Sequence, residues 1–340
     1  MMRAAIERAW WAARPGWLSH VLLPLAWLYG LAWHGRRLAY AAGWLKAERA
    51  PVPVVVVGNL IVGGAGKTPT VIALVQALRQ RGWTPGVISR GYGSHADHAR
   101  EVNDESVAGE CGDEPLLIRR RTRAPVWVGR HRVTAARALC AAHPEVDVIV
   151  SDDGLQHHAL ARDAQLIVFD ERGIGNGRLL PAGPLREPFS GAPPARSTVI
   201  YNAAAPSTAW PGPRVQRALG GALPLRAWWA GDAATPEGLQ ALVGRPLLAA
   251  AGIASPPRFF DMLTAAGLRF EPLPLPDHAA LDPRPWPAQA PCVVLTEKDA
   301  VKIPASAPDA DKIHVATLDF PLPGETVDAL LAWLEPQRPR

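Results

Sequence analysis

A glycine-rich segment followed by lysine and threonine is the part of the chain best suited to chemistry. In PVVVVGNLIVGGAGKTPT, an apolar run precedes Gly63, Gly64 and Gly66, and Lys67 and Thr68 follow at once. Glycines let backbone N–H groups converge on phosphate oxygens at the start of a helix. Lysine reaches the β- and γ-phosphates, and the threonine hydroxyl coordinates Mg²⁺. The spacing therefore predicts an ATP-binding P-loop.

The loop departs from the general P-loop pattern G-x-x-x-x-G-K-[ST] at one position. Ile61 stands where the first glycine is usual, so the loop follows a GGxGKT variant. A glycine-rich turn without a ligand is the alternative. The residues expected to bind ATP are Ile61, Val62, Gly63, Gly64, Ala65, Gly66, Lys67 and Thr68.

A pair of aspartates supplies the second element that a Mg²⁺ site of this kind needs. Asp152 and Asp153 follow the run VDVIV, where a buried strand is expected to end. Carboxylate oxygens suit Mg²⁺, which keeps several waters and bridges substrate phosphates. We expect Thr68 and one or both of these aspartates to hold the metal. The alternative is that the aspartates cap a helix.

The N-terminal segment has the composition of a membrane-binding helix. From Trp17 to Trp33 it is apolar except for Ser19 and His20, and basic residues flank it. Six of the 13 tryptophans lie within the first 44 residues, and indoles favour the lipid–water boundary. We predict that residues 1–46 dock in the plane of a membrane. A cleaved signal peptide, a spanning helix and a helical hairpin packed on the protein itself are the alternatives.

The distribution of charge argues against nucleic acid as a partner. The net charge is +5, and the first fifty residues hold seven basic and two acidic side chains. The remaining chain has 29 of each sign, so no basic surface is expected there. The three cysteines lack C-x-x-C spacing, which argues against a disulfide framework or a zinc site.

Beyond Pro51, short β-branched runs alternate with alanine-rich helical segments, a pattern typical of βαβ units around a mostly parallel sheet. Strands are expected at 54–57, 87–89, 126–128, 146–150, 166–169 and 198–201, and then at 247–251, 293–296 and 314–317. Helices are expected at 68–81, 133–142, 257–266 and 326–334. The prediction is an α/β fold with two α/β domains, the first a P-loop NTPase-like parallel sheet that follows the hydrophobic docking helix.

Seven short motifs occur in one order along the chain and together resemble a single family. They are GNLIVGGAGKTP, SRGYG (89–93), GDEP (112–115), SDDGLQHH, GNGRLLPAGPLREP, PDH (276–278) and LTEKDAVK. The family is the tetraacyldisaccharide 4′-kinase family of lipid A synthesis, and the resemblance extends to about Lys302. It implies ATP-dependent phosphorylation of the 4′-hydroxyl of a tetraacyldisaccharide 1-phosphate, a glycolipid, to give lipid IVA. It also implies a location at the cytoplasmic face of the inner membrane, and it implies no protein partner.

The resemblance assigns two catalytic residues. Asp113 in GDEP corresponds to the family's proposed base, and His278 in PDH corresponds to its partner. The chemistry agrees, because transfer to an alcohol needs a carboxylate near the hydroxyl, and a histidine from another domain can orient it when a cleft closes. Without the resemblance, Asp113 is expected to cap a helix and His278 to be a surface loop residue.

The resemblance also implies two α/β/α domains with the site in the cleft between them, and the composition of the chain suggests their bounds. Residues 47–205 are expected to form the P-loop kinase domain, 206–225 a linker, and 226–340 the α/β domain that closes the cleft. The Gly/Pro/Arg-rich stretch 171–194 is too long for a simple connection and is predicted to be a binding loop. Within it, Arg178 and Arg186 are candidate clamps for phosphate or substrate, with solvated loop arginines as the alternative.

Two other classes of protein use similar elements. A P-loop GTPase or metallochaperone is suggested by TEKD (296–299), but its lysine directly precedes the aspartate, whereas guanine-reading motifs separate the two by one residue. A membrane-bound positioning switch would hydrolyse ATP without an acceptor. Phosphorylation of a glycolipid in proportion to ATP consumed distinguishes a kinase from such a switch.

Overall fold

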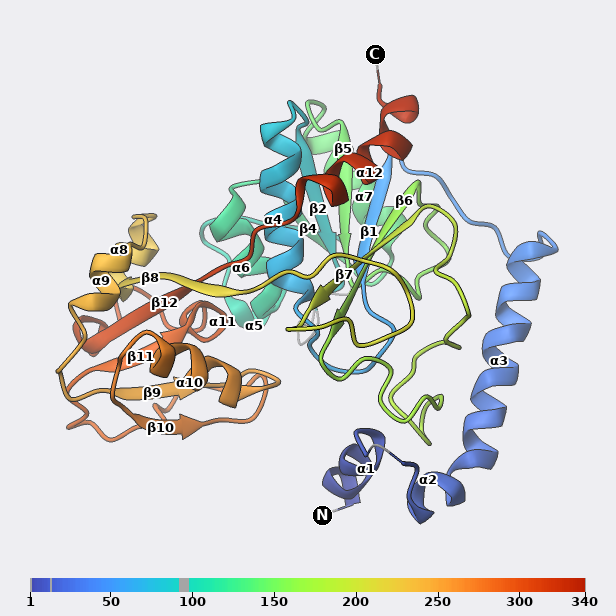
Figure 1. Cartoon of the computed structure of the whole chain (residues 1–340). Helices are drawn as coiled ribbons and strands as arrows, with labels where there is room; N and C mark the ends of the chain where they lie inside the picture. The colour runs from blue at the N-terminus through green and yellow to red at the C-terminus, as the bar shows by residue number, and fades with distance from the viewer. Residues whose placement is uncertain (1, 13, 92–97, 340) are drawn as a thin grey trace.

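The valine run before the P-loop forms β1 (Val54–Gly58), an inner strand of a seven-stranded sheet in the computed structural model (Figure 1). All five residues of β1 are buried, because helices cover both faces of this sheet. Alternate valines face opposite sides of the sheet, two in the core cluster that includes α4 (Lys67–Gln80) and two in the cluster that includes residues of α7 (Arg132–Ala142). The chain is described over residues 2–12, 14–91 and 98–339, so Tyr92 and Gly93 of the SRGYG motif lie outside the described residues.

The first sheet has the strand order β3-β4-β2-β5-β1-β6-β7, and all neighbours run parallel except β3 and β4. Its other strands are β2 (Pro85–Ser89), β3 (Arg100–Val102), β4 (Val126–Val128), β5 (Val148–Asp152), β6 (Ala164–Asp170) and β7 (Ser197–Asn202). The six strands expected here are present, each with its ends within two residues of the prediction. The antiparallel edge strand β3 was not predicted.

The second sheet has the order β10-β9-β11-β12-β8, and its only antiparallel pair among the described strands is β12 with β8. The strands are β8 (Ala218–Pro224), β9 (Leu248–Ala251), β10 (Glu271–Pro274), β11 (Val293–Thr296) and β12 (Ile313–Asp319). The fold is therefore α/β with two mixed sheets. The remaining helices are α5 (Ala108–Cys111), α6 (Asp113–Thr122), α8 (Leu225–Ala230), α9 (Pro236–Gln240), α10 (Pro256–Ala265), α11 (Glu297–Ala300) and α12 (Gly324–Leu334).

Two features correct the expected division of the chain. The strand β8 occupies part of 206–225, which was expected to be a linker, because its backbone pairs with β12 despite the proline- and alanine-rich sequence around it. Helix α12 lies within the range 226–340, yet it packs on the first sheet, beside α4 and β6 (Figure 1). The chain thus crosses between the sheets twice, before β8 and after β12.

Three helices, α1 (Met2–Trp10), α2 (Trp17–Val21) and α3 (Leu23–Ala41), precede the first sheet. In Figure 1, α3 stands on the side of the first sheet away from the second sheet. One face of α3 packs on the long loop, where Gly30 lies against Leu179, while Trp27 and Leu31 are 70% and 71% exposed. Among the described residues, no helix is both long enough and apolar enough to cross a bilayer.

A buried carboxylate joins the two sheets on the side of α6. Glu297, at the first position of α11, is 6% exposed and accepts hydrogen bonds from the Trp228 indole (3.2 Å) and the Leu318 backbone N–H (3.1 Å). It also pairs with the guanidinium of Arg121 from α6. Because a buried charge is stable only with its partners, this cluster holds the second sheet against the first.

We predict that Glu297→Ala lowers the free energy of unfolding by about 3 kcal/mol, because Arg121 loses its carboxylate partner and the Trp228 and Leu318 N–H groups lose their acceptor. Urea unfolding followed by tryptophan fluorescence measures the change. The matched control is Glu335→Ala, at an exposed position, which should leave the midpoint unchanged. Equal midpoints for the two variants would contradict this role of Glu297.

Candidate active site

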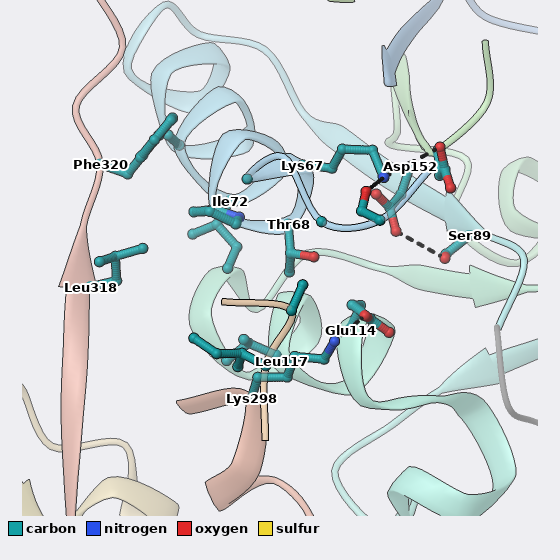
Figure 2. Close-up of a pocket in the computed structure, with 18 of the residues that line it drawn as sticks. Lys67, Thr68, Ile72, Ser89, Glu114, Leu117, Asp152, Lys298, Leu318 and Phe320 are labelled. Carbon is teal, nitrogen blue, oxygen red and sulfur yellow. Dashed lines mark hydrogen bonds and ion pairs between the residues drawn. The ribbon is translucent and has the colours of Figure 1, made fainter. Parts of the chain in front are cut away.

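A cavity of 1690 Å³ lies between the two sheets, with the P-loop on one side. The first half of the molecule, built on the seven-stranded sheet, contributes the P-loop, one face of α4 and the carboxyl end of β5. The second half, built on the five-stranded sheet, contributes residues 253–255, 258–259, 296–298 and 318–322. Figure 2 shows Lys67, Asp152 and Ser89 at one end of this space and Leu318 and Phe320 at the other. The cavity thus has a charged end and an apolar end.

The P-loop has the backbone shape that its glycines predict. Gly63 and Gly66 adopt left-handed conformations, with φ of +92° and +97°, which glycine favours. A side chain at Gly66 would meet the amide nitrogen of Asn202, which donates to the Ala65 carbonyl at 2.9 Å. Asn202, at the end of β7, therefore holds the P-loop backbone in place.

Lys67 is held at the charged end of the cavity. Its Nζ donates to Asn59 Oδ1 at 3.0 Å and lies 3.7 Å from Asp153 Oδ1. Burial lowers the pKa of Lys67, and the neighbouring Asp153 carboxylate opposes that effect. Thr68 follows it and lines the same cavity (Figure 2).

The two aspartates have different surroundings. Asp152 is buried and accepts a hydrogen bond from Ser89 Oγ at its Oδ2. Within the part of the chain that the structure describes, its buried Oδ1 has no hydrogen-bond partner. Burial, with Asp153 and Glu114 nearby, raises the pKa of Asp152 to about 6. Burial also disfavours the charged form of Asp153, but Lys67 and Arg186 outweigh it and lower the pKa of Asp153.

The long loop reaches the P-loop through its C-terminal part. Leu185 forms a β-bridge with Ile61, which is fully buried, so the residue at the usual first glycine position anchors the P-loop to this loop. The Arg186 guanidinium donates to both carboxylate oxygens of Asp153, at 2.8 and 3.1 Å. Arg178 instead contacts the Ser19 carbonyl at 3.2 Å and lies outside the described lining of the cavity.

Asp113 and His278, 165 residues apart, meet across the boundary between the halves. Asp113 is the first residue of α6, and its Oδ2 lies 3.0 Å from His278 Nδ1. Burial raises the pKa of Asp113, but the hydrogen bond with His278 and the charges of Lys302 and Lys298 outweigh it, and the net shift is downward. The same hydrogen bond raises the pKa of His278. The pair therefore favours a carboxylate beside a protonated imidazole.

Several residues of the site were not predicted from the sequence. Asn59 follows β1 and binds Lys67, and Asn202 ends β7 and binds the P-loop backbone. Arg132 donates from Nη2 to the Asp152 carbonyl at 2.9 Å. The position of an asparagine immediately after an expected strand is a usable signal, since the carboxyl ends of parallel strands gather ligand-binding residues. The role of Arg132 depends on tertiary packing alone.

Comparison with known proteins identifies the family of the chain. The profile of the family described as tetraacyldisaccharide-1-P 4′-kinase matches residues 18–335. A tetraacyldisaccharide 4′-kinase of Leptothrix cholodnii is 54% identical over 99% of this chain and 98% of its own length. One from Methylibium petroleiphilum is 51% identical over 99% and 96%.

The fold has a counterpart among solved structures. The "apo" form of LpxK from Aquifex aeolicus, in complex with ATP, superposes with a TM-score of 0.76 at 24% identity, over 93% of this chain and 99% of that chain. At that identity the likeness concerns the fold. The sequence matches, which extend over nearly the whole chain, show that it belongs to the tetraacyldisaccharide-1-phosphate 4′-kinase family.

Proposed function

We infer that this chain is a lipid A 4′-kinase, which transfers the γ-phosphoryl group of ATP to the 4′-hydroxyl of a tetraacyldisaccharide 1-phosphate. The observation that carries this function is that the P-loop and His278, the partner of Asp113, line one cavity. The nucleotide phosphates belong at the charged end, beside Lys67. The apolar end, with Ile72, Leu318 and Phe320, suits the adenine ring.

The reaction joins the sugar 4′-oxygen to the γ-phosphorus and breaks the bond from that phosphorus to the β,γ-bridging oxygen, so ADP leaves. Asp113 accepts the hydroxyl proton, since its lowered pKa keeps it ionised at neutral pH. Lys67 stabilises the negative charge on the transferring group. Arg186 and Asp153 neutralise each other at the edge of the site, and together they orient the long loop.

The residues at the charged end fit Mg²⁺. The unpartnered, buried Oδ1 of Asp152 is a ligand atom without another role among the described residues, whereas Asp153 is engaged by Arg186. Thr68 and Asp152 would hold the ion, with Asp153 next to it. When bound, Mg²⁺ supplies positive charge to the β- and γ-phosphate oxygens.

The glycolipid reaches the site from a membrane surface. We assign the docking surface to the outward face of α3, where Trp27, Leu28 and Leu31 are 64–71% exposed, together with Trp17 and Trp44, 77% and 84% exposed. Amphipathic residues of this kind place a helix in the plane of the lipid interface. Tyr29, on the inward side of α3, lines the catalytic cavity. One face of α3 therefore borders the cavity, and the opposite face carries the proposed lipid-binding residues. The cytoplasmic face of the inner membrane is the expected location.

Lys67→Ala and Thr68→Ala should each lower kcat by about 100-fold or more, because one removes a charge from the phosphates and the other a metal ligand. The assay follows radiolabelled phosphate from ATP into tetraacyldisaccharide 1-phosphate in detergent micelles. Lys312→Ala, a surface lysine outside this cavity, is the control. ATP consumption without a labelled glycolipid in the wild type would contradict the proposed function.

Asp113→Ala should lower kcat by about 10²- to 10⁴-fold with little change in ATP affinity, the usual effect of losing a positioned base. His278→Ala should have a smaller effect, because the imidazole acts through the carboxylate. The double variant should be hardly slower than Asp113→Ala, since the two residues share one task. Losses that multiply would mean that they act independently.

Replacing Trp27 and Leu31 together by glutamine should weaken binding to anionic phospholipid vesicles by about tenfold or more, because two apolar side chains no longer enter the lipid. Co-sedimentation measures the partition constant. Val243→Gln changes an exposed apolar residue of the second half and should bind like the wild type. Unchanged vesicle binding by the α3 variant would place the docking surface elsewhere.

A further inference from the structure

The motif LTEKDAVK contributes a lysine that contacts the catalytic carboxylate directly. Lys302 Nζ lies 3.4 Å from Asp113 Oδ2, 3.1 Å from Asp299 Oδ1 and 3.1 Å from the Ala279 carbonyl oxygen. Its side chain is 10% exposed. One ammonium group therefore joins the first half of the molecule, the helix α11 and the residue that follows His278.

The position of Lys302 is set by a buried aspartate. Asp299 is fully buried, and its Oδ2 accepts hydrogen bonds from the Gly252 N–H at 2.9 Å and from Thr296 Oγ1 at 2.7 Å. Its other oxygen, Oδ1, meets Lys302. A side chain at Gly252 would approach Oδ1 to 2.8 Å, so this close contact requires glycine. Asp299 thus ties α11 to the loop after β9.

The same loop supports the turn that carries His278. The His278 N–H donates to the Gly252 carbonyl at 3.3 Å, and His278 has a φ of +60°, an uncommon conformation for a residue other than glycine. Lys302 contacts the next carbonyl, that of Ala279. Asp299 therefore supports this turn through Gly252, and Lys302 supports it through the Ala279 carbonyl.

Lys298 has a different set of partners, although it belongs to the same motif. Its Nζ lies 2.8 Å from Glu114 Oε1, 3.0 Å from Asp277 Oδ1 and 3.4 Å from His278 Nε2. Lys298 is thus engaged on the far side of the imidazole ring. Of the two lysines, Lys302 is the one with a direct contact to Asp113.

We propose that Lys302 is a positioning residue for phosphoryl transfer, which holds Asp113 Oδ2 jointly with His278 and leaves Oδ1 to accept the proton of the sugar hydroxyl. The inference rests on the proposed kinase function and extends it. The contacts of His278 and Lys302 both fall on Oδ2, and both cations come from the second half. The carboxylate is therefore oriented only when the two halves are assembled.

The charged groups around Asp113 set the direction of the pH effect. His278, Lys298 and Lys302 face it from the second half, Glu114 follows it on α6, and Cys111 precedes it. Burial raises the pKa of the Cys111 thiol to about 11, so Cys111 carries no charge at neutral pH. An ammonium group beside a carboxylate favours its ionised form. Removal of the Lys302 charge therefore raises the pKa of Asp113 and moves the acidic limit of activity to higher pH.

The test is the pH dependence of kcat for Lys302→Met in the glycolipid assay at saturating ATP. The acidic limb should move up by about 1 pH unit or more, the usual effect of an adjacent opposite charge, and kcat at neutral pH should fall by about 10- to 100-fold. KM for ATP should stay unchanged, because Lys302 has no contact with the P-loop among the described residues. Lys312→Met is the matched control and should give the wild-type profile.

A second variant separates positioning from folding. Lys302→Met leaves the buried Asp299 carboxylate without its cationic partner and should lower the melting temperature. Asp299→Asn combined with Lys302→Met removes that charge and should restore the melting temperature. The double variant should keep the shifted acidic limb. If it recovers both stability and the wild-type pH profile, Lys302 serves the fold alone and the inference is wrong. A wild type without acceptor-dependent ATP consumption would instead overturn the proposed function.

Discussion

The hydrogen bond between Asp113 Oδ2 and His278 Nδ1 constrains how the two halves of the molecule are placed, because each half contributes one of its two residues. A distance of 3.0 Å between a side chain of α6 and one of the loop after β10 requires the two sheets to keep a fixed relation. Glu297 contributes by accepting hydrogen bonds from Trp228 and Leu318 while pairing with Arg121 on the helix that begins at Asp113. The Arg121–Glu297 pair thus lies two turns of α6 from the Asp113–His278 pair.

The charged end of the cavity shows how one cluster divides its tasks. Asp153 is neutralised by Arg186 and Lys67, whereas the buried Oδ1 of Asp152 has no hydrogen-bond partner among the described residues. Two adjacent carboxylates so close together cannot both remain ionised without cations nearby, and the cationic partners favour Asp153. The surroundings raise the pKa of Asp152 and lower the pKa of Asp153. We therefore interpret Asp153 as an organiser of the loop and Asp152 as the metal-facing group.

The sequence predicted local elements well, because their signals are local. The P-loop joins β1 to α4, and both elements begin or end within one residue of the prediction, since glycine placement and apolar runs determine them. The family motifs paired Asp113 with His278 correctly as neighbours. Their distance and the oxygen involved come only from the structure.

What the sequence missed depends on contacts between distant parts of the chain. The apolar face of α12 predicts burial, but it carries no information on which sheet receives it, and this helix returns to the first sheet. The strand β8 lies in a proline- and alanine-rich passage whose pairing partner, β12, follows about 90 residues later. Lys302 is a similar case, because a lysine after a short helix reads as a surface residue until its three acceptors are seen.

The N-terminal helix α3 connects the proposed docking surface to the charged end of the cavity through two contacts. Trp27 and Leu28 face solvent, whereas the hydroxyl of Tyr29, the next residue, donates to the Arg186 carbonyl at 2.7 Å. Arg186 in turn binds Asp153, the neighbour of Lys67. The helix that carries the proposed docking surface therefore holds, with its other face, the loop whose Arg186 binds Asp153. This arrangement suits an acceptor whose acyl chains stay in the membrane while its sugar hydroxyl reaches the nucleotide.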